Sequence, residues 1–306
     1  MREMFIGEYI RQNRQNQGLS QEKLCEGICE PMTLSRLENG KQTPSRNRIK
    51  ALLQRLGLPD DRYFALLNKY EIEVNNIQRD LGSAISNQDI PLGWEKVREL
   101  EAIVEKDDQI TRQLILRAKA VLGRRDGTYS QEEARDMLLE ALRITVPRFD
   151  LEDINQCRYC LEEVKIINSI ANIYSDLGDN KKAANIFSQL LKYVEKHYWH
   201  LSQAGAILAL VAFNYSRVLD LVKRYEDAIE VAEIGRYACI KFGHYESLPD
   251  VLAVMAECRY FLGEREESAR LYTQAYYLYQ AIDNKRDLAV IADEAKRYLE
   301  IEFIYQ

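Results

Sequence analysis

The feature that most constrains this chain of 306 residues is a turn motif that recurs along its length. In each copy a leucine, usually followed by glycine, precedes a small residue that opens a new amphipathic stretch. The pairs are Leu122 with Ala134, Leu177 with Ala183, Leu221 with Ala228, and Leu262 with Ser268. The small residues lie 49, 45 and 40 positions apart. This pattern predicts helical hairpins, which must stack on one another to bury their apolar faces.

A degenerate fifth copy of the motif lies at residues 91–97. Together the copies resemble elongated tetratricopeptide repeats, in which small and aromatic residues let two helices pack closely. The resemblance implies about five hairpins over residues 69–284, stacked into a superhelix with a concave face, and a capping helix over 285–306. Gly and Pro number only 14 and 6. This low content of chain breakers favours an all-α fold over a loop-rich β protein.

Charge is distributed unevenly along the chain. Residues 1–68 carry a net charge of +3 and the remainder −9, so only the first segment suits a polyanion such as nucleic acid. The longest apolar run, residues 204–213, is about half of the ~20 residues that cross a bilayer, and acidic residues interrupt the start of the chain. We therefore expect a cytoplasmic chain with no membrane contact and reduced cysteines.

Residues 1–68 predict a domain of five short helices. The first helix is expected from about Met4 to Gln17, and a short fifth one ends at Asn68. The boundary signals between them are Gly18 and Gly40 as stops, Ser20 and Ser45 as N-caps, and Pro31 as a first helical residue.

The third predicted helix has two distinct faces. At 100° per residue, Leu34 and Leu37 point into the core. Three side chains fall on the opposite face: Met32, Ser35 and Arg36. Glu30 and Thr33 flank them near the helix start, where a recognition helix meets base edges. For Met32 alone, local packing of its apolar stem is an equal alternative.

Residues 10–11, 18–22 and 34–41 resemble the helix-turn-helix of phage-repressor-like regulators, the XRE family. The connection at 26–30 is one residue shorter than the common repressor turn, as in peptide-pheromone regulators. The resemblance implies that Arg14 and Glu38 pair to join the first and third helices. It also implies a homodimer on a near-palindromic operator in duplex DNA. The expected DNA contacts are Gln21 (to phosphate), Glu30, Met32, Thr33, Ser35, Arg36, Asn39, Lys41 and Arg46.

A repressor-like head joined to such hairpins resembles the RNPP group of Gram-positive bacteria and their Rgg relatives. This resemblance implies a quorum-sensing transcription regulator whose repeat groove holds a short, extended signalling peptide. Asn side chains suit that task, because an amide can satisfy one N–H and one C=O of the peptide backbone.

The candidate peptide contacts follow from the repeat register. Asn168 and Asn172 lie four residues apart and share one helix face. The equivalent positions in the other repeats are Gln113 and Arg117, then Asn214 or Ser216 with Arg217, and finally Glu257. Glu257 departs from the pattern and suits a basic peptide residue. The alternative for all of these polar residues is that they face water.

Two other functions remain open from the sequence. One alternative is a repeat groove that binds a protein partner. The other is dephosphorylation of response regulators, although relatives that do only this lack the helix-turn-helix head. Cys157 with Cys160 and His197 with His200 have metal-ligand spacing, but each pair lacks the further ligands that a zinc site needs. We therefore expect no enzyme activity, no metal and no cofactor.

Overall fold

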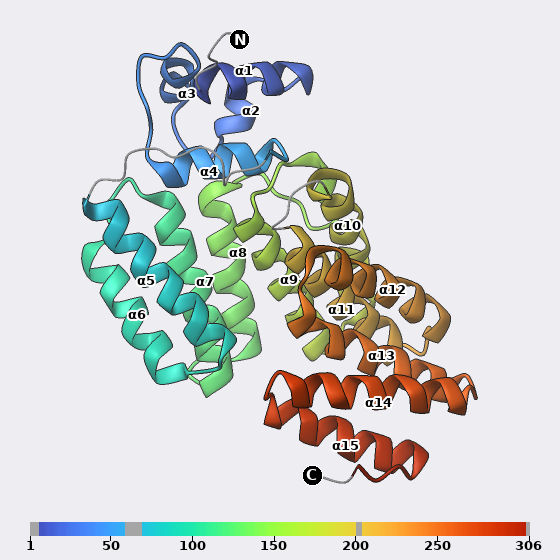
Figure 1. Cartoon of the computed structure of the whole chain (residues 1–306). Coiled ribbons are helices and arrows are strands. Elements are labelled where there is room, and N and C mark those ends of the chain that lie inside the picture. The colour runs from blue at the N-terminus through green and yellow to red at the C-terminus, as the bar shows by residue number, and fades with distance from the viewer. Residues whose placement is uncertain (1–5, 59–68, 200–203, 304–306) are drawn as a thin grey trace. The chain divides into compact units, whose positions relative to one another are not determined.

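The computed structural model describes residues 6–58, 69–199 and 204–303. Within these ranges every regular element is a helix and no strand occurs, so the predicted all-α fold is confirmed (Figure 1). The chain divides into two compact units, residues 1–177 and 178–306.

Unit 1 begins with four short helices around one apolar core. They are α1 (Ile6–Asn16), α2 (Gln21–Cys25), α3 (Pro31–Glu38) and α4 (Arg46–Arg55). The predicted N-caps are confirmed, because Ser20 Oγ accepts from Lys23 N at 3.1 Å and Ser45 Oγ accepts from Arg48 N at 3.4 Å. The predicted fifth helix of this segment lies outside the described residues.

Five longer α-helices follow in the described part of unit 1. They are α5 (Lys69–Ser86), α6 (Ile90–Ile103), α7 (Gln109–Asp126), α8 (Gln131–Thr145) and α9 (Leu161–Asp176), with a 3₁₀ turn at Ile154–Gln156 before α9. Each helix packs against the next one along the chain. Val74, Val97, Leu100 and Leu122 are buried between α5, α6 and α7. This packing is that of consecutive antiparallel hairpins.

One predicted turn lies later in the chain than expected. Leu122-Gly123 does not end its helix, since α7 continues to Asp126 and the turn falls at Gly127, whose φ is +81°. A Cβ added at Gly123 would lie 2.1 Å from the ring of Tyr129. Gly123 therefore serves close packing of Tyr129 on the helix rather than a chain reversal.

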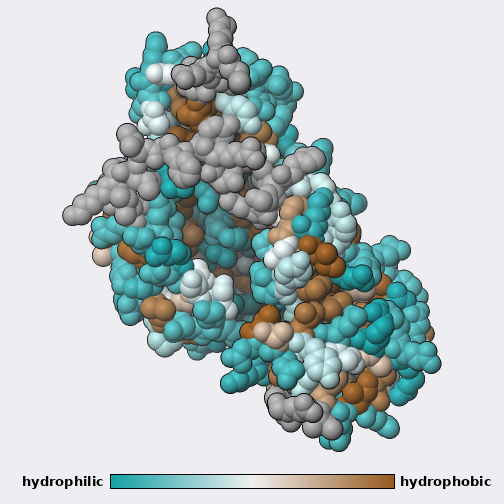
Figure 2. Space-filling view, in the orientation of Figure 1, coloured by the Kyte–Doolittle hydropathy of each residue, from teal (hydrophilic) through white to brown (hydrophobic). Residues whose placement is uncertain are grey.

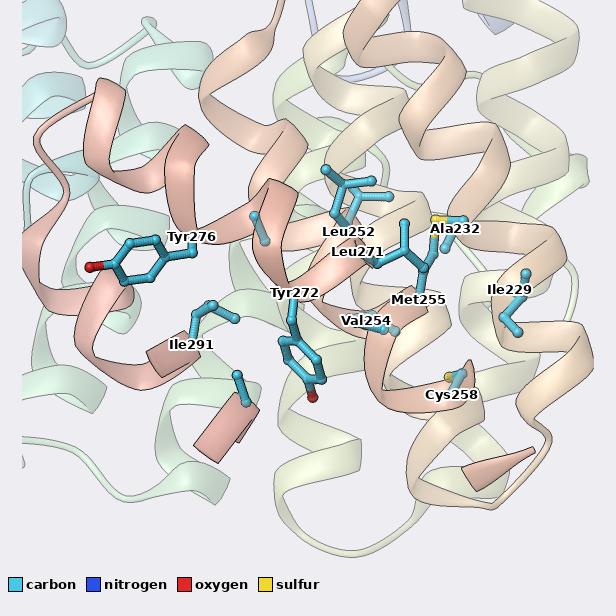
Figure 3. Packing of buried hydrophobic residues seen from close by; sticks show 14 of the residues in the cluster. Ile229, Ala232, Leu252, Val254, Met255, Cys258, Leu271, Tyr272, Tyr276 and Ile291 are labelled. Carbon is cyan, nitrogen blue, oxygen red and sulfur yellow. The ribbon is translucent and has the colours of Figure 1, made fainter. Parts of the chain in front are cut away.

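In its described residues, unit 2 contains six α-helices. They are α10 (Asn180–Tyr198), α11 (Ala204–Leu221), α12 (Tyr225–Phe242), α13 (Leu248–Phe261), α14 (Arg265–Ala281) and α15 (Lys285–Leu299), with a 3₁₀ turn at Tyr245–Ser247. The interior of α11–α15 is one cluster of buried side chains that includes Met255, Leu271 and Tyr272 (Figure 3).

The small residues that follow the turns are buried, as the repeat pattern predicts. Ala183, Ala228 and Ser268 have no exposed surface, and Ser268 Oγ donates to Ala256 O at 2.7 Å. A larger side chain at these positions would separate the two helices of a hairpin. The turn residues Gly178 and Gly263 have positive φ, which explains why glycine recurs there.

The terminal helix is shorter than predicted. It was expected to run to the end of the chain, but α15 ends at Leu299 because Glu300 adopts a left-handed conformation with φ of +61°. The chain then turns back, and the ring of Phe303 stacks on Tyr276 at 4.0 Å.

Exposed apolar side chains occur mainly in unit 2. In the space-filling view, hydrophobic residues gather over α11–α13 (Figure 2). Ile240 and Tyr277 are each at least half exposed and line a groove of about 510 Å³ between α12, α13 and α14. Among the described residues, no helix is long and apolar enough to cross a membrane.

Candidate functional site

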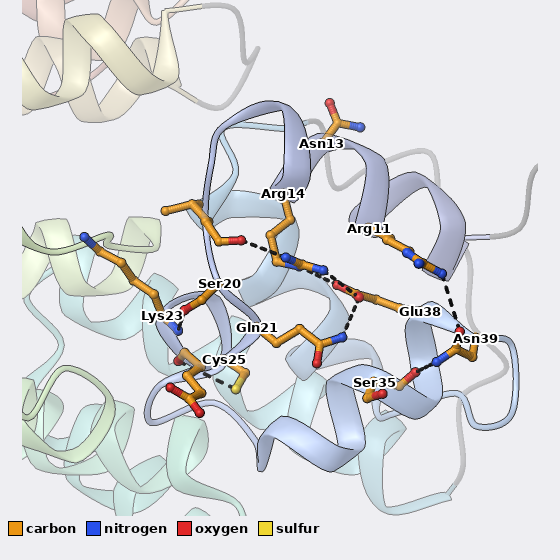
Figure 4. A network of polar contacts seen from close by, with 12 residues as sticks. Arg11, Asn13, Arg14, Ser20, Gln21, Lys23, Cys25, Ser35, Glu38 and Asn39 are labelled. Carbon is orange, nitrogen blue, oxygen red and sulfur yellow. Dashed lines mark hydrogen bonds and ion pairs between the residues drawn. The ribbon is translucent and has the colours of Figure 1, made fainter.

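A buried ion pair fixes the position of α3. Arg14 on α1 donates to both carboxylate oxygens of Glu38 on α3, from Nε at 2.7 Å and from Nη2 at 2.9 Å (Figure 4). Its Nη1 also donates to Leu19 O at 2.7 Å. The hydrogen bond to Glu38 raises the pKa of Arg14. The expected pairing is therefore confirmed, and it joins α1 and α3 with the bidentate geometry of the strongest ion pairs.

Gln21 takes part in the same network. Its Nε2 donates to Glu38 Oε2 at 2.6 Å (Figure 4), so this amide nitrogen holds α3 in place. The predicted phosphate contact of Gln21 must then use its amide oxygen or the backbone N–H groups at the start of α2.

The remaining surface of α3 matches the predicted faces except at Ser35, which was expected on the exposed face and is half-buried. Leu34 and Leu37 are buried, whereas Glu30 and Arg36 are exposed and Met32 is 65% exposed. Thr33 and Ser35 are half-buried between the two faces. The exposure of Met32 means that its side chain does not pack locally, and α3 presents a polar face with one apolar side chain.

The chain beyond α3 adds further polar groups to this surface. Asn39 Nδ2 donates to Ser35 O at 2.7 Å, and Arg11 Nη1 on α1 donates to Asn39 Oδ1 at 3.5 Å (Figure 4). Lys41 is exposed and Arg46 is half-buried in the first turn of α4. Arg11 was not among the candidates, although it lies within the motif. Its exposed cationic side chain next to Asn39 makes it a further candidate for a phosphate contact.

The helix-turn-helix segment is joined to the hairpins of unit 1 by a second buried ion pair. Arg55, at the end of α4, is 2% exposed, and its Nη2 lies 3.0 Å from Glu163 Oε1 on α9. Nη2 also donates to Thr145 O at 2.9 Å, and Nη1 donates to Leu24 O at 3.1 Å. One guanidinium group therefore binds α2, the end of α8 and the start of α9.

Close backbone packing accompanies this ion pair. Gly27 has φ of +70°, and a Cβ added there would lie 2.0 Å from Thr145 O. Gln54 Oε1 accepts from Leu161 N at 3.1 Å. We define Gly27, Gln54, Arg55, Thr145 and Glu163 as the junction. Its members are distant in sequence, and no local pattern indicated them.

Gln113, a predicted peptide contact, belongs to the interior next to the junction. Its side chain is 1% exposed, and its Nε2 donates to Thr145 Oγ1 at 2.5 Å and to Ala141 O at 2.9 Å. Thr145 Oγ1 in turn donates to Glu163 Oε1 at 2.6 Å. The amide donors of Gln113 are thus used within the protein, and its role as a peptide contact stays a prediction.

Arg117 lies one turn further along α7 and pairs with α9. Its Nη1 is 2.7 Å from Glu162 Oε1. Burial raises the pKa of Glu162, but the positive charges of Arg117 and Lys165 outweigh burial and lower that pKa to about 2. Glu162 and Glu163 are neighbours, so the first turn of α9 holds α7 through one carboxylate and α4 through the other.

The two asparagines of α9 differ in burial. Asn168 is 5% exposed, whereas Asn172 is half-buried. Asn172 is therefore the more accessible of the two amides that were predicted to contact a peptide, and its role stays a prediction.

In unit 2 the predicted peptide positions lie on α11 and α13. Asn214 is 5% exposed and Ser216 is fully buried, with its Oγ donating to Phe213 O at 2.8 Å. Arg217 is exposed. Glu257 Oε1 accepts from Tyr298 Oη on α15 at 2.8 Å. These observations favour Arg217 and Glu257 as the accessible members of the set.

The cysteine and histidine pairs form no metal site in the described part of the chain. No group of three or more His, Cys, Asp or Glu side chains there has metal-binding geometry. Burial, the largest effect, raises the pKa of both Cys157 and Cys160, which disfavours the thiolate that binds zinc. His200 lies outside the described residues.

Comparison with known proteins identifies the architecture. A helix-turn-helix family model matches residues 10–62, and the model of the RNPP family C-terminal domain matches residues 133–300. None of the curated protein sequences matches the chain.

Solved structures share the fold over nearly the whole length. PlcR of Bacillus thuringiensis, in complex with the peptide PapR7 and DNA, aligns with 94% of this chain and 99% of its own, at 21% identity and a TM-score of 0.65. The apo form of the competence regulator ComR from Streptococcus vestibularis covers 96% and 98%, at 15% identity and a TM-score of 0.53. ComR of S. thermophilus, in complex with DNA and its signalling peptide ComS, covers 95% and 98%, at 18% identity and a TM-score of 0.51.

These matches define a protein with an N-terminal helix-turn-helix and a C-terminal domain of helical hairpins. The C-terminal family model alone spans more than half of the residues. The chain belongs to the RNPP family.

Substitution of Arg14 tests the buried pair that fixes α3. Arg14→Ala leaves the carboxylate of Glu38 buried without its cation, which costs about 3–5 kcal/mol in the free energy of unfolding. Arg11→Ala on the same helix is the matched control and should change it by less than about 0.5 kcal/mol. Urea unfolding measures both. An Arg14→Ala variant that unfolds like wild type but prefers different DNA sequences would contradict the structural role.

Substitution of Arg55 tests the junction in the same way. Arg55→Met should destabilise the chain by about 3–5 kcal/mol, and Arg55→Met with Glu163→Leu should recover part of that loss, because the unpaired charge is then removed. Arg48→Met is the control, since Arg48 pairs with Asp107 at an exposed site and such pairs contribute about 0–1 kcal/mol. Equal losses for Arg55→Met and Arg48→Met would contradict a buried junction.

Proposed function

We propose that this chain is a sequence-specific, DNA-binding transcription regulator whose activity is controlled by a short signalling peptide bound to its repeat domain. The observation that carries the proposal is the presented face of α3. Its exposed side chains include Met32 and Arg36, and the Arg14–Glu38 pair holds the helix from behind. Such a helix suits insertion into the major groove of DNA.

Membership in the RNPP family and the structural neighbours support both ligands. PlcR was crystallised with a peptide and DNA, and ComR of S. thermophilus with DNA and its signalling peptide. The chain is proposed to act in the cytoplasm, where its operators are, and by binding rather than by catalysis. We also propose a homodimer, because two recognition helices about one DNA turn (~34 Å) apart can read a near-palindromic operator.

The junction supplies a physical link between the two activities. Peptide contacts at Arg117 or Asn172 act on α7 and α9, and the first turn of α9 holds Arg55 at the end of the helix-turn-helix segment. A peptide that binds one arrangement of these helices more tightly shifts the population toward it. A 10–100-fold change in operator affinity requires a coupling free energy of about 1.4–2.8 kcal/mol.

Substitution of Arg36 tests DNA binding. Arg36→Ala should weaken operator binding by about 1–3 kcal/mol if the side chain reaches a base, and should reduce the salt dependence if it contacts a phosphate. Arg79→Ala, an exposed arginine on α5, is the control that should leave affinity unchanged. The measurement is a fluorescence-anisotropy titration of operator DNA at several salt concentrations. Unchanged affinity and salt slope for Arg36→Ala would remove this residue from the interface.

Substitution of Asn172 tests peptide control. Asn172→Ala should weaken binding of the cognate peptide and its effect on operator affinity, with little change in stability, because the side chain is only half-buried. Asn87→Ala, an exposed asparagine after α5, is the control. Calorimetry with peptides encoded beside the gene provides the readout. Equal peptide affinity for both variants places the site elsewhere, and binding of a protein but of no peptide favours the alternative of a protein partner.

A further inference from the structure

Three carboxylates of unit 2 lie on helices that two side-chain hydrogen bonds join, from Cys258 on α13 to α11 and from Tyr298 on α15 to α13. They are Asp220 on α11, Glu257 on α13 and Glu294 on α15, and each is half-buried. Burial and then the charge of Glu257 raise the pKa of Asp220 to about 6 and that of Glu294 to about 7. These three side chains form what we call the acidic cluster. At neutral pH its members repel one another.

The neighbouring cations leave the acidic cluster unpaired. In the described ranges, no salt bridge joins a Lys or Arg to any of its three carboxylates. Arg297 lies on the same helix as Glu294, but it pairs with Asp293 at 2.6 Å. Arg217, on the same helix as Asp220, is exposed and lies over the ring of Phe213 at 5.7 Å. Arg217 lowers the pKa of Asp220, and Arg297 lowers that of Glu294. Burial and the charge of Glu257 outweigh both effects.

Two donors fix the carboxylates in place. Tyr298 Oη donates to Glu257 Oε1 at 2.8 Å, and Cys258 Sγ donates to Asp220 Oδ1 at 3.4 Å. Each of these carboxylates has a second oxygen, and Glu294 has no hydrogen bond among the described residues. The acidic cluster therefore retains acceptor capacity for a ligand with several donors.

The hydroxyl of Tyr272 is an independent sign of a missing ligand. Tyr272 is fully buried, and its Oη has no hydrogen-bond partner in the described part of the chain. In Figure 3 the hydroxyl points away from Leu252 and Leu271. The ring of Tyr272 lies 6.5 Å from that of Tyr298, whose hydroxyl binds Glu257, so Tyr272 borders the acidic cluster. Burial and then the charges of Glu294 and Glu257 raise the pKa of this hydroxyl. A buried hydroxyl without a partner is costly, and a bound donor removes that cost.

Aromatic rings border the acidic cluster. The ring centroids of Tyr298 and Tyr260 are 4.8 Å apart, and those of Tyr298 and Phe261 are 5.7 Å apart. Phe261 is 46% exposed. Aromatic faces next to carboxylates suit an organic cation, which gains from the ring quadrupole as well as from the negative charges. Metal-binding geometry is absent among the described residues.

We propose that the acidic cluster and Tyr272 receive one cationic group of the bound signalling peptide. This group is either the N-terminal ammonium or the side chain of a Lys or Arg residue. The proposal rests on the proposed peptide binding and adds the chemistry that the peptide must carry. Glu257 was a candidate peptide contact from the repeat register, whereas Asp220 and Glu294 were not. Glu294 lies on the terminal helix, to which the sequence assigned only a capping role.

The repulsion within the acidic cluster predicts a pH-dependent stability without any peptide. Glu294 titrates near pH 7 in the folded chain and near 4.3 when unfolded, so the folded state loses stability as pH rises from about 4 to 7. Glu294→Gln removes this loss. It should raise the Tm by about 2–4 °C at pH 8 and leave it unchanged at pH 4. Glu226→Gln, an exposed carboxylate on α12, is the control. Equal Tm values of wild type and Glu294→Gln at pH 8 would overturn the proposal.

Defined peptide pools test the ligand itself. Heptapeptide pools carry Lys, Arg, norleucine or Glu at one fixed position and have a free or acetylated N-terminus. Their affinity for the full-length chain is measured by fluorescence polarisation at pH 7.5. We expect one cationic pool to bind wild type and Glu226→Gln at least 10-fold more tightly than its neutral counterpart. Asp220→Asn and Glu294→Gln should lose this preference.

The pools also show which group of the peptide supplies the cation, and they separate a failure of the cation site from a failure of peptide binding. Loss of the preference on acetylation identifies the N-terminal ammonium, and loss on changing Lys or Arg to norleucine identifies a side chain. Equal binding of cationic and neutral pools, or a preference kept in both variants, would overturn the cation site while peptide binding stands. No binding of any pool to wild type would overturn the proposed peptide control, and the cation site with it.

Discussion

The buried ion pair between Arg55 and Glu163 is the interaction on which the organisation of unit 1 depends. It joins the last turn of the helix-turn-helix segment to the first turn of α9, and Thr145 O at the end of α8 accepts from the same guanidinium. A buried pair is poor evidence for stability by itself, because desolvation offsets much of its attraction. Its geometric demands are strict, however, so it specifies one position of the head on the hairpins.

The first turn of α9 connects this junction to the repeat surface. Glu163 holds the head, and its neighbour Glu162 holds Arg117 on α7. A ligand that moves α7 relative to α9 therefore acts on adjacent carboxylates, one of which belongs to the junction. Coupling between a ligand on α7 and the junction therefore needs no long chain of contacts, because both are held by the first turn of α9. Two ligands, one on the repeats and one on the helix-turn-helix segment, can therefore both shift the equilibrium between positions of α9.

Local features of this fold could be predicted from the sequence, and long-range ones could not. The caps at Ser20 and Ser45 and the buried face of α3 follow from nearest-neighbour chemistry. Leu122-Gly123 was misread because the same dipeptide serves a turn at Leu177-Gly178 and helix packing against Tyr129 here. Arg55 and Glu163 are 108 residues apart, and the acidic cluster joins three helices, so both depend on packing that no local pattern encodes.

The central claim is that two copies of the chain bind a specific DNA sequence as a symmetric homodimer. The most direct measurement is selection of binding sites from random duplex DNA by the purified full-length chain. The account predicts enrichment of two inverted half-sites whose centres lie about one helical turn apart, roughly 10 base pairs. Salt-dependent retention of DNA with no enriched sequence would contradict it.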